Sequence, residues 1–298
     1  MDVIATEGLT LSYGKRVGIQ GVDLNVPIGE IFGFLGPNGA GKTTTIRILL
    51  GLLKPSHGSA RIFNQDCWSQ SASIKQEIGY LPGDLRLYPW FTAKRALDIL
   101  SSLRGQNLSA AGQKFLQRFQ LDELVPVRKM SRGMRQKLGI VLALVHKPKL
   151  LVLDEPTSGL DPLMCDELYR CLREMASLGT TVFFSSHTLS EVESLCSRVA
   201  IIRQGNIIAD ESINALRKRA YRSVELRFVN AEEAARVELP VFLQLEENDG
   251  ATYRCVLTGT TPQLIEWAAQ QRLEDLSVSP PSLESLFRRF YEPQENGS

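Results

Sequence analysis

One short segment constrains the fold of this 298-residue chain more than any other. Residues 36–43 read GPNGAGKT, a glycine-rich run that ends in a lysine and a hydroxyl side chain. The apolar run before it, residues 31–35, is typical of a short buried parallel strand. Residues 44–53 then repeat apolar side chains at helical spacing. This order predicts a strand, a glycine turn and a helix, the context in which such a turn binds phosphate.

The phosphate-binding interpretation gives a role to each part of this loop. Glycines let backbone N–H groups turn toward an anion, and the start of the following helix adds partial positive charge. Lys42 is predicted to neutralise the β- and γ-phosphates of a nucleotide, and the Thr43 hydroxyl to bind Mg²⁺. The alternative, an ordinary glycine turn, is disfavoured by the flanking strand and helix. The residues predicted to contact the nucleotide here are Gly36, Pro37, Asn38, Gly39, Ala40, Gly41, Lys42, Thr43 and Thr44.

The composition is that of an ordinary globular chain with room for two domains. Hydrophobic residues make up 43% and charged residues 22%, and the net charge of +1 gives no sign of nucleic-acid binding. The longest apolar runs fall far short of the ~20 residues that span a bilayer, and the N-terminus lacks the features of a signal peptide. Five cysteines without a C-x-x-C pair favour reduced thiols over disulfides or a metal site.

Two further apolar runs end in polar residues. Residues 150–153 are followed by Asp154 and Glu155, and residues 180–185 lead to His187. Because ligands of open α/β sheets bind at the carboxyl ends of the strands, these side chains are expected to face the phosphates. Asp154 is predicted to hold Mg²⁺, Glu155 to polarise the attacking water and His187 to donate a hydrogen bond to the γ-phosphate. The alternative is a set of solvated polar residues at strand ends.

The segment SRGMRQ, residues 131–136, predicts a second helix start that faces phosphate. Serine is a good N-cap, and glycine lets an anion approach the exposed N–H groups. The apolar residues of 138–145 follow at helical spacing. A plain capped helix with a solvated basic face would have the same spacing, so both interpretations stay open on spacing alone.

Together these segments resemble the ATP-binding subunit of an ATP-binding cassette (ABC) transporter. GPNGAGKTT and LLVLDEP match the two Walker motifs of that family, and SRGMRQ resembles its signature motif, usually LSGGQ. SGLD at 158–161 matches the D-loop, and SSH at 185–187 matches the switch histidine. LSYG places Tyr13 where the family stacks an aromatic ring on adenine. The resemblance covers roughly the first three quarters of the chain, and kinases and small GTPases do not share this set of motifs.

The resemblance implies an α/β fold: a P-loop ATPase core with an antiparallel β subdomain and a helical subdomain at about 92–145. This nucleotide-binding domain is expected to cover residues 1–215, and a small accessory α+β domain to cover 216–298. In the accessory domain, alternating and apolar patterns predict strands and two helices. The strands are expected at 222–229, 241–247 and 251–259 and again before residue 279, and the helices from Thr261 and from about Ser279.

The resemblance also implies an ATPase mechanism. Two copies of the chain are expected to form a head-to-tail dimer around two ATPs, with Mg²⁺ at each site. Ser131 and Gly133 of one copy would then act on the ATP of the other, and Asp161 would connect the two sites. The dimer is expected to drive an integral-membrane permease, which would hold it at the cytoplasmic face of the membrane.

Two classes of function are alternatives to an exporter. An importer ATPase is the nearer one; a soluble cassette ATPase that acts on ribosomes or DNA is the other. The chain has one cassette, no sustained heptads and a near-neutral charge, which disfavours the second class. Met130, Arg132 and Met134 depart from the usual signature in a way that resembles drug exporters, as does the C-terminal segment. An exporter without a nucleic-acid partner is therefore expected.

The segment at 78–92, IGYLPGDLRLYPWFT, departs most from the family, where it aligns with the Q-loop. Gly83 occupies the position of the Q-loop glutamine, which in the family contacts Mg²⁺ and links the nucleotide to the membrane subunit. Either Asp84 takes over that contact, directly or through water, or the site lacks it. The segment at 86–91, RLYPWF, has two interpretations: local core of the helical subdomain, or a surface for a helix of the permease.

Overall fold

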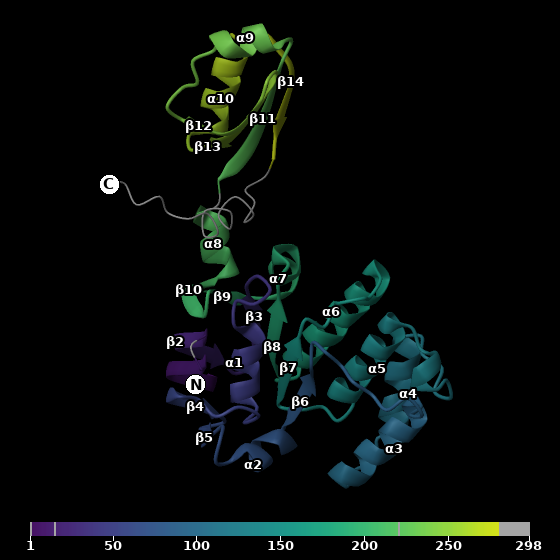
Figure 1. Ribbon diagram of the computed structural model, residues 1–298. Helices are drawn as coiled ribbons and strands as arrows, with labels where there is room; N and C mark the ends of the chain where they lie inside the picture. The colour runs from purple at the N-terminus through teal and green to yellow at the C-terminus, as the bar shows by residue number, and fades with distance from the viewer. Residues whose placement is uncertain (1, 15, 220, 280–298) are drawn as a thin grey trace. The chain divides into compact units, whose positions relative to one another are not determined.

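The computed structural model describes residues 2–14, 16–219 and 221–279 and contains two compact units (Figure 1). The first unit is Met1–Ile213 and the second is Asn214–Ser298. The division lies two residues before the boundary expected from the sequence. Among the described residues, no helix combines the length and the apolar character that a membrane span requires.

The first unit is built on a six-stranded sheet in the order β10-β9-β3-β8-β7-β6. All neighbouring strands are parallel except β9 and β10, which form an antiparallel pair. The strands β3, β7 and β8 are buried along their whole length, as a parallel sheet covered on both faces requires. The strands are β3 (Ile31–Leu35), β6 (Ile78–Leu81), β7 (Leu150–Asp154), β8 (Thr181–Ser186), β9 (Arg198–Arg203) and β10 (Asn206–Ser212).

A second sheet of the first unit is antiparallel and has the order β2-β1-β4-β5. Its inward side chains join those of β3 and helix α1 in one hydrophobic core, with Ile4, Leu24 and Phe34 fully buried. This packing fixes the antiparallel sheet beside the start of α1. The strands are β1 (Asp2–Tyr13), β2 (Arg16–Pro27), β4 (His57–Ile62) and β5 (Gln65–Asp66).

Helices α3, α4 and α5 pack on one another next to β6 and form the helical subdomain (Figure 1). Their bounds are α3 (Ala93–Arg104), α4 (Ser109–Arg118) and α5 (Arg132–Leu144), with a short 3-10 helix at Val127–Lys129. The other helices of the first unit are α1 (Lys42–Leu49), α2 (Ser71–Gln76), α6 (Pro162–Ser177) and α7 (Leu189–Leu195), and α8 (Ile213–Arg219) begins at the last residue of this unit and continues in the second. The α/β class with its antiparallel and helical subdomains is thereby confirmed.

The helix after the phosphate loop is shorter than the expected 44–53. It begins at Lys42 and ends at Leu49, because Leu50 leaves the helical conformation and Gly51 has a φ of 60°. A side chain at Gly51 would also meet the carbonyl oxygen of Cys67 at 2.4 Å. The apolar spacing continues past the helix because the turn packs on the same core.

The second unit repeats a β-α-β motif and has the strand order β12-β13-β11-β14, with every neighbouring pair antiparallel. This is the split β-α-β arrangement, with one strand of each repeat at the centre. Its own core includes Leu226, Phe228 and Leu264. The elements are β11 (Arg222–Phe228), α9 (Ala231–Arg236), β12 (Leu243–Asp249), β13 (Thr252–Leu257), α10 (Thr261–Ala268) and β14 (Leu273–Val278). The last helix expected from about Ser279 lies outside the described residues.

Candidate nucleotide-binding site

The loop between β3 and α1 has the backbone that its glycines predict. Gly39 and Gly41 have φ values of 80° and 115°, in the left-handed region that favours glycine. A Cβ at Gly41 would lie 2.7 Å from Ile19 Cγ2 and 3.0 Å from the Gly18 carbonyl oxygen, so space also demands glycine there. Gly41 is the N-cap of α1 and carries no side chain that could bond the first N–H groups. An anion can therefore bind these donors.

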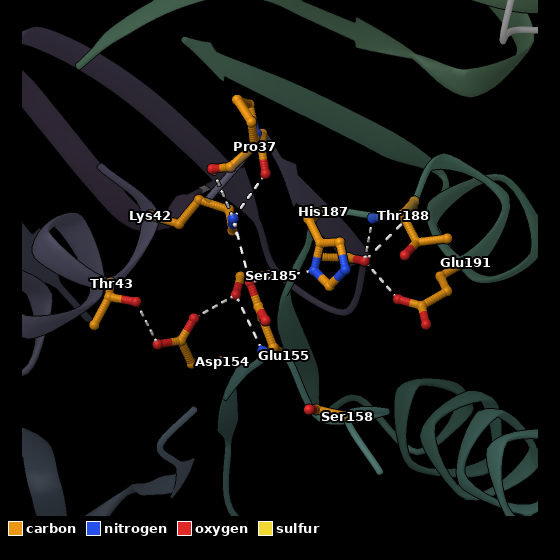
Figure 2. A network of polar contacts seen from close by, with 12 residues as sticks. Pro37, Lys42, Thr43, Asp154, Glu155, Ser158, Ser185, His187, Thr188 and Glu191 are labelled. Atoms are coloured by element: carbon orange, nitrogen blue, oxygen red, sulfur yellow. Dashed lines mark hydrogen bonds and ion pairs between the residues drawn. The ribbon is translucent and has the colours of Figure 1, made fainter. Parts of the chain in front are cut away.

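The Lys42 ammonium lies at the centre of the site and is only 5% exposed. Its Nζ donates to the carbonyl oxygens of Gly36 and Pro37, at 2.7 and 3.2 Å. It also lies 3.3 Å from Oε1 of Glu155, which comes from the end of β7 (Figure 2). A cation held this way is presented to any phosphate bound in the loop.

The predicted metal ligands Thr43 and Asp154 are in direct contact. Thr43 Oγ1 donates to Asp154 Oδ2 at 2.8 Å, although the two residues are 111 positions apart in the sequence. Asp154 is 1% exposed, and its other oxygen accepts from Ser185 Oγ at 2.6 Å. A hydroxyl and a carboxylate that is already oriented are hard oxygen donors of the kind Mg²⁺ prefers, so the donor set fits that ion.

The residue at the Q-loop glutamine position lies against this metal-ligand pair. A Cβ on Gly83 would be 3.3 Å from Asp154 Oδ2. The Asp84 carboxylate instead pairs with Arg86 at 2.8 Å, and both side chains are largely exposed. Among the described residues, the polar partner of the Asp84 side chain is therefore Arg86 and not Thr43 or Asp154.

The predicted switch histidine lies beside one carboxylate oxygen of the predicted base. His187 Nδ1 lies 3.4 Å from Oε1 of Glu155, the same oxygen that Lys42 approaches (Figure 2). The loop that carries His187 is fixed by Ser186, whose Oγ donates to Glu191 and accepts from the Thr188 N–H at 2.9 Å. A histidine with a proton on Nδ1 can therefore donate to this carboxylate, or to a phosphate that takes its place.

Tyr13 and the phosphate loop line a common cavity of about 350 Å³. The Tyr13 side chain is 47% exposed and its ring packs over residue 18, where a Cβ would come within 2.9 Å of Tyr13 Cε2. An aromatic ring beside a phosphate loop is positioned to stack on a nucleobase. The lining residues are Tyr13, Val17, Gly18, Asn38, Gly39, Gly41, Lys42, Thr43, Thr44 and Glu155.

The signature residues lie at the start of α5, away from this cavity. Ser131 is the N-cap of α5, and its Oγ accepts from the Met134 N–H at 3.2 Å, as the sequence predicts. A Cβ on Gly133 would meet the Gly159 carbonyl oxygen at 2.6 Å. Asp161 caps α6 and accepts from the Met164 N–H at 3.0 Å. The described residues that line the cavity do not include Ser131, Gly133 or Asp161.

Two buried polar residues were missed by the sequence prediction of the site. Ser185 is fully buried, bonds Asp154 and accepts from the Glu155 N–H at 3.2 Å. Gln136 is 6% exposed, and its Nε2 donates to the Pro156 carbonyl oxygen at 2.9 Å. Both residues lie in segments that the sequence analysis matched to family motifs, Gln136 in SRGMRQ and Ser185 in SSH, but a motif does not name a hydrogen-bond partner.

A parallel sheet with a phosphate loop, two acids and a histidine at its carboxyl edge defines a P-loop ATPase. A family model described as ABC transporter matches residues 19–158. The bacitracin transport ATP-binding protein BcrA of Bacillus licheniformis is 39% identical over 78% of this chain and 77% of that protein. The Nod factor export ATP-binding protein I of Burkholderia orbicola (strain AU 1054) is 32% identical over 93% of each chain.

Solved structures agree with this assignment. A structure described as the ATP binding subunit of an ABC transporter superposes with a TM-score of 0.68 at 27% identity, over 73% of this chain and 92% of that chain. The chain therefore belongs to the ATP-binding subunits of ABC transporters, which bind ATP and hydrolyse it.

Proposed function

We propose that this chain drives a membrane exporter by closing around two ATPs as a head-to-tail homodimer. The observation that carries the proposal is that the phosphate loop and the signature helix start, which are both expected to contact ATP, lie apart on one chain. The phosphate loop lines the cavity, while Ser131 at the start of α5 is not among the described residues that line it. A second copy brings its own helix start to the first copy's ATP, and the head-to-tail arrangement does this at both sites at once.

The proposed hydrolysis uses the convergence on Glu155. In the structure Lys42 and His187 both approach Oε1 of Glu155. A γ-phosphate competes for both donors, because it carries more negative charge than one carboxylate. Glu155 is then free to accept a proton from the attacking water. Thr43 and Asp154 would hold Mg²⁺, and the ion, when bound, would neutralise negative charge on the phosphates.

The proposed contact with the permease is the aromatic connector, residues 88–91, between β6 and α3. Tyr88 and Trp90 are 63% and 61% exposed, and their ring centroids lie 5.6 Å apart. This exposure contradicts the interpretation of these two rings as local core. Exposed aromatic anchors are typical of sites that bind a partner helix. The permease would in turn hold the subunit at the cytoplasmic face of the membrane.

The connector is also tied to the segment that leads into the signature. The Val127 N–H donates to the Phe91 carbonyl oxygen at 2.8 Å, and the Arg128 N–H donates to that of Pro89 at 2.9 Å. Only a few residues separate this segment from Ser131. When a permease helix moves the connector, these two hydrogen bonds therefore transmit the movement to the segment that precedes Ser131, which is proposed to face the partner's ATP.

Export is favoured over import by the names of relatives. Relatives over at least two thirds of the chain include proteins named for bacitracin transport, Nod factor export and linearmycin resistance. The near-neutral net charge of +1 gives no support for a nucleic-acid partner.

A substitution at Glu155 tests the proposed mechanism. Glu155→Gln keeps the shape of the side chain but removes its basicity, so ATP binding is expected to persist while turnover falls by roughly 100-fold or more. Size-exclusion chromatography with ATP is expected to show a stable dimer. Near-wild-type turnover in a steady-state ATPase assay would remove Glu155 from the role of base.

Mixed dimers test the composite site. Ser131→Arg places a bulky side chain where close backbone approach is needed, and Lys42→Ala removes the phosphate-binding cation, so each variant alone is expected to be inactive. In a mixed dimer one interface carries both lesions and the other carries neither. Activity should partly return on mixing. Zero activity, while mass analysis confirms mixed dimers, would exclude independently working composite sites.

A further inference from the structure

The backbone of Glu155 has an uncommon conformation. Its φ is 50°, in the left-handed region that residues with a Cβ rarely adopt. Such a conformation persists only where the surrounding structure holds it in place, and it is concentrated at functional sites. The orientation of the Glu155 carboxylate therefore depends on whatever fixes the peptide groups on either side.

Two buried side chains fix these peptide groups. On the N-terminal side, the Glu155 N–H donates to the carbonyl oxygen and to the Oγ of Ser185, each at 3.2 Å. On the C-terminal side, Gln136 Nε2 donates to the Pro156 carbonyl oxygen at 2.9 Å and lies 3.5 Å from that of Glu155. Ser185 is fully buried and Gln136 is 6% exposed, so water competes little for these bonds.

We propose that Gln136 and Ser185 are positioning residues that hold the Glu155 backbone so that its carboxylate faces the attacking water. This rests on the proposed role of Glu155 as base. Neither side chain reaches the nucleotide cavity, whose lining among the described residues includes Glu155 but not these two. The effect of Gln136 on catalysis is exerted through Glu155, whereas Ser185 also orients the carboxylate of Asp154.

The position of Gln136 on α5 links the two proposed ATP sites of the dimer. Gln136 lies on α5, whose N-cap Ser131 is proposed to face the partner's ATP. The same end of α5 makes a second contact with the segment after Glu155, because Arg132 donates to Ser158 Oγ at 2.6 Å. Helix α5 therefore positions Glu155 at one ATP site and carries Ser131, which is proposed to act on the ATP of the other site.

Gln136→Met tests the proposal in the full-length protein. Methionine has a similar length but no N–H donor, so the Glu155 turn loses its C-terminal bond. The kcat for ATP hydrolysis is expected to fall by at least about tenfold, because small misplacement of a catalytic group is costly, with KM for ATP unchanged. The matched control is Gln113→Met, on the exposed surface of α4, which is expected to retain wild-type kcat.

The decisive measurement combines Gln136→Met with Glu155→Gln. If Gln136 acts only through the carboxylate, the double variant should keep the residual single-turnover rate of Glu155→Gln, because effects through one group are not additive. It should also keep the ATP-dependent dimer on size-exclusion chromatography. A further tenfold loss of rate, or loss of the dimer, would overturn the proposal and assign Gln136 to α5 stability or to the signature.

The single variants distinguish failure of the proposed role of Glu155 from failure of the positioning proposal alone. If Glu155→Gln retains turnover, the proposed role of Glu155 fails. If Glu155→Gln is inactive and Gln136→Met has wild-type kcat, only the positioning proposal fails. Should Gln136→Met not fold, as judged by circular dichroism and thermal melting, Gln136→Asn keeps the amide on a shorter side chain and allows the same comparison.

Discussion

At the scale of single residues, burial decides which titrations affect stability. The clearest case outside the nucleotide site is His146, two residues beyond α5. Burial, with the nearby positive charge of Arg104 adding to it, lowers the pKa of His146 to about 4. The neutral imidazole keeps its Nε2 within 3.2 Å of the Ile78 carbonyl oxygen. Protonation of this ring therefore favours the unfolded chain.

This pKa predicts an acid-dependent loss of stability. Because the pKa in the folded state is below the unfolded value of about 6.5, the neutral histidine contributes fully above pH 6.5, and its contribution is lost as pH falls toward 4. The melting temperature of the wild type should thus fall more steeply between pH 6.5 and 4.5 than that of His146→Gln. Parallel curves in differential scanning fluorimetry would contradict this prediction.

At the scale of elements, helix starts serve both folding and the proposed chemistry. Ser131 and Asp161 are the N-caps of α5 and α6, and each accepts a hydrogen bond from a backbone N–H in the first turn. Pro162 follows Asp161 in the first turn, where its missing N–H costs nothing. A cap that also reaches a dimer interface would have two roles, and substitutions that differ in capping ability can separate them.

Asp161 offers this separation. Asp161→Ala removes the cap and is expected to cost about 1 kcal/mol of unfolding free energy, or a melting temperature lower by about 2–4 °C. Asp161→Asn keeps a good cap and so should keep the wild-type melting temperature. If Asp161 also connects the two ATP sites, the asparagine variant should still lose ATPase activity. Wild-type turnover in Asp161→Asn would leave Asp161 with the capping role alone.

At the scale of the whole molecule, each of the two compact units has a hydrophobic core of its own among the described residues. The core around Phe32 and Phe34 contains only residues of the first unit, and the core around Leu226 and Phe228 only residues of the second. The complete set of nucleotide-site residues lies in the first unit. Folding and nucleotide binding of that unit should therefore not depend on the second.

Truncation tests this independence. A fragment of residues 1–213 is expected to fold cooperatively and to bind a fluorescent ATP analogue with unchanged affinity. Thermal melting and equilibrium titration measure the two properties, with the Lys42→Ala fragment as the control for specific binding. A fragment that aggregates, or that folds but has lost its affinity, would show that the second unit is needed for the site.

The features that could be predicted from the sequence are local. The phosphate loop needs only two left-handed glycines and a helix start, the buried strands need only continuous apolar runs, and the Ser131 cap needs only its own first turn. Each depends on the stereochemistry of a few consecutive residues. The meeting of Asp154, Glu155 and His187 was also predictable, because parallel strands bring their carboxyl ends to one edge.

Contacts between distant segments and the exposure of side chains depend instead on how the chain packs. The partners of Ser185 and Gln136, the placement of Gly83 rather than Asp84 beside Asp154, and the outward orientation of Tyr88 and Trp90 are not encoded by spacing. A hydrogen-bond partner is fixed by strand order and by the packing of α5 on the sheet. Whether an aromatic ring is buried depends on what covers it, and that is a property of distant segments.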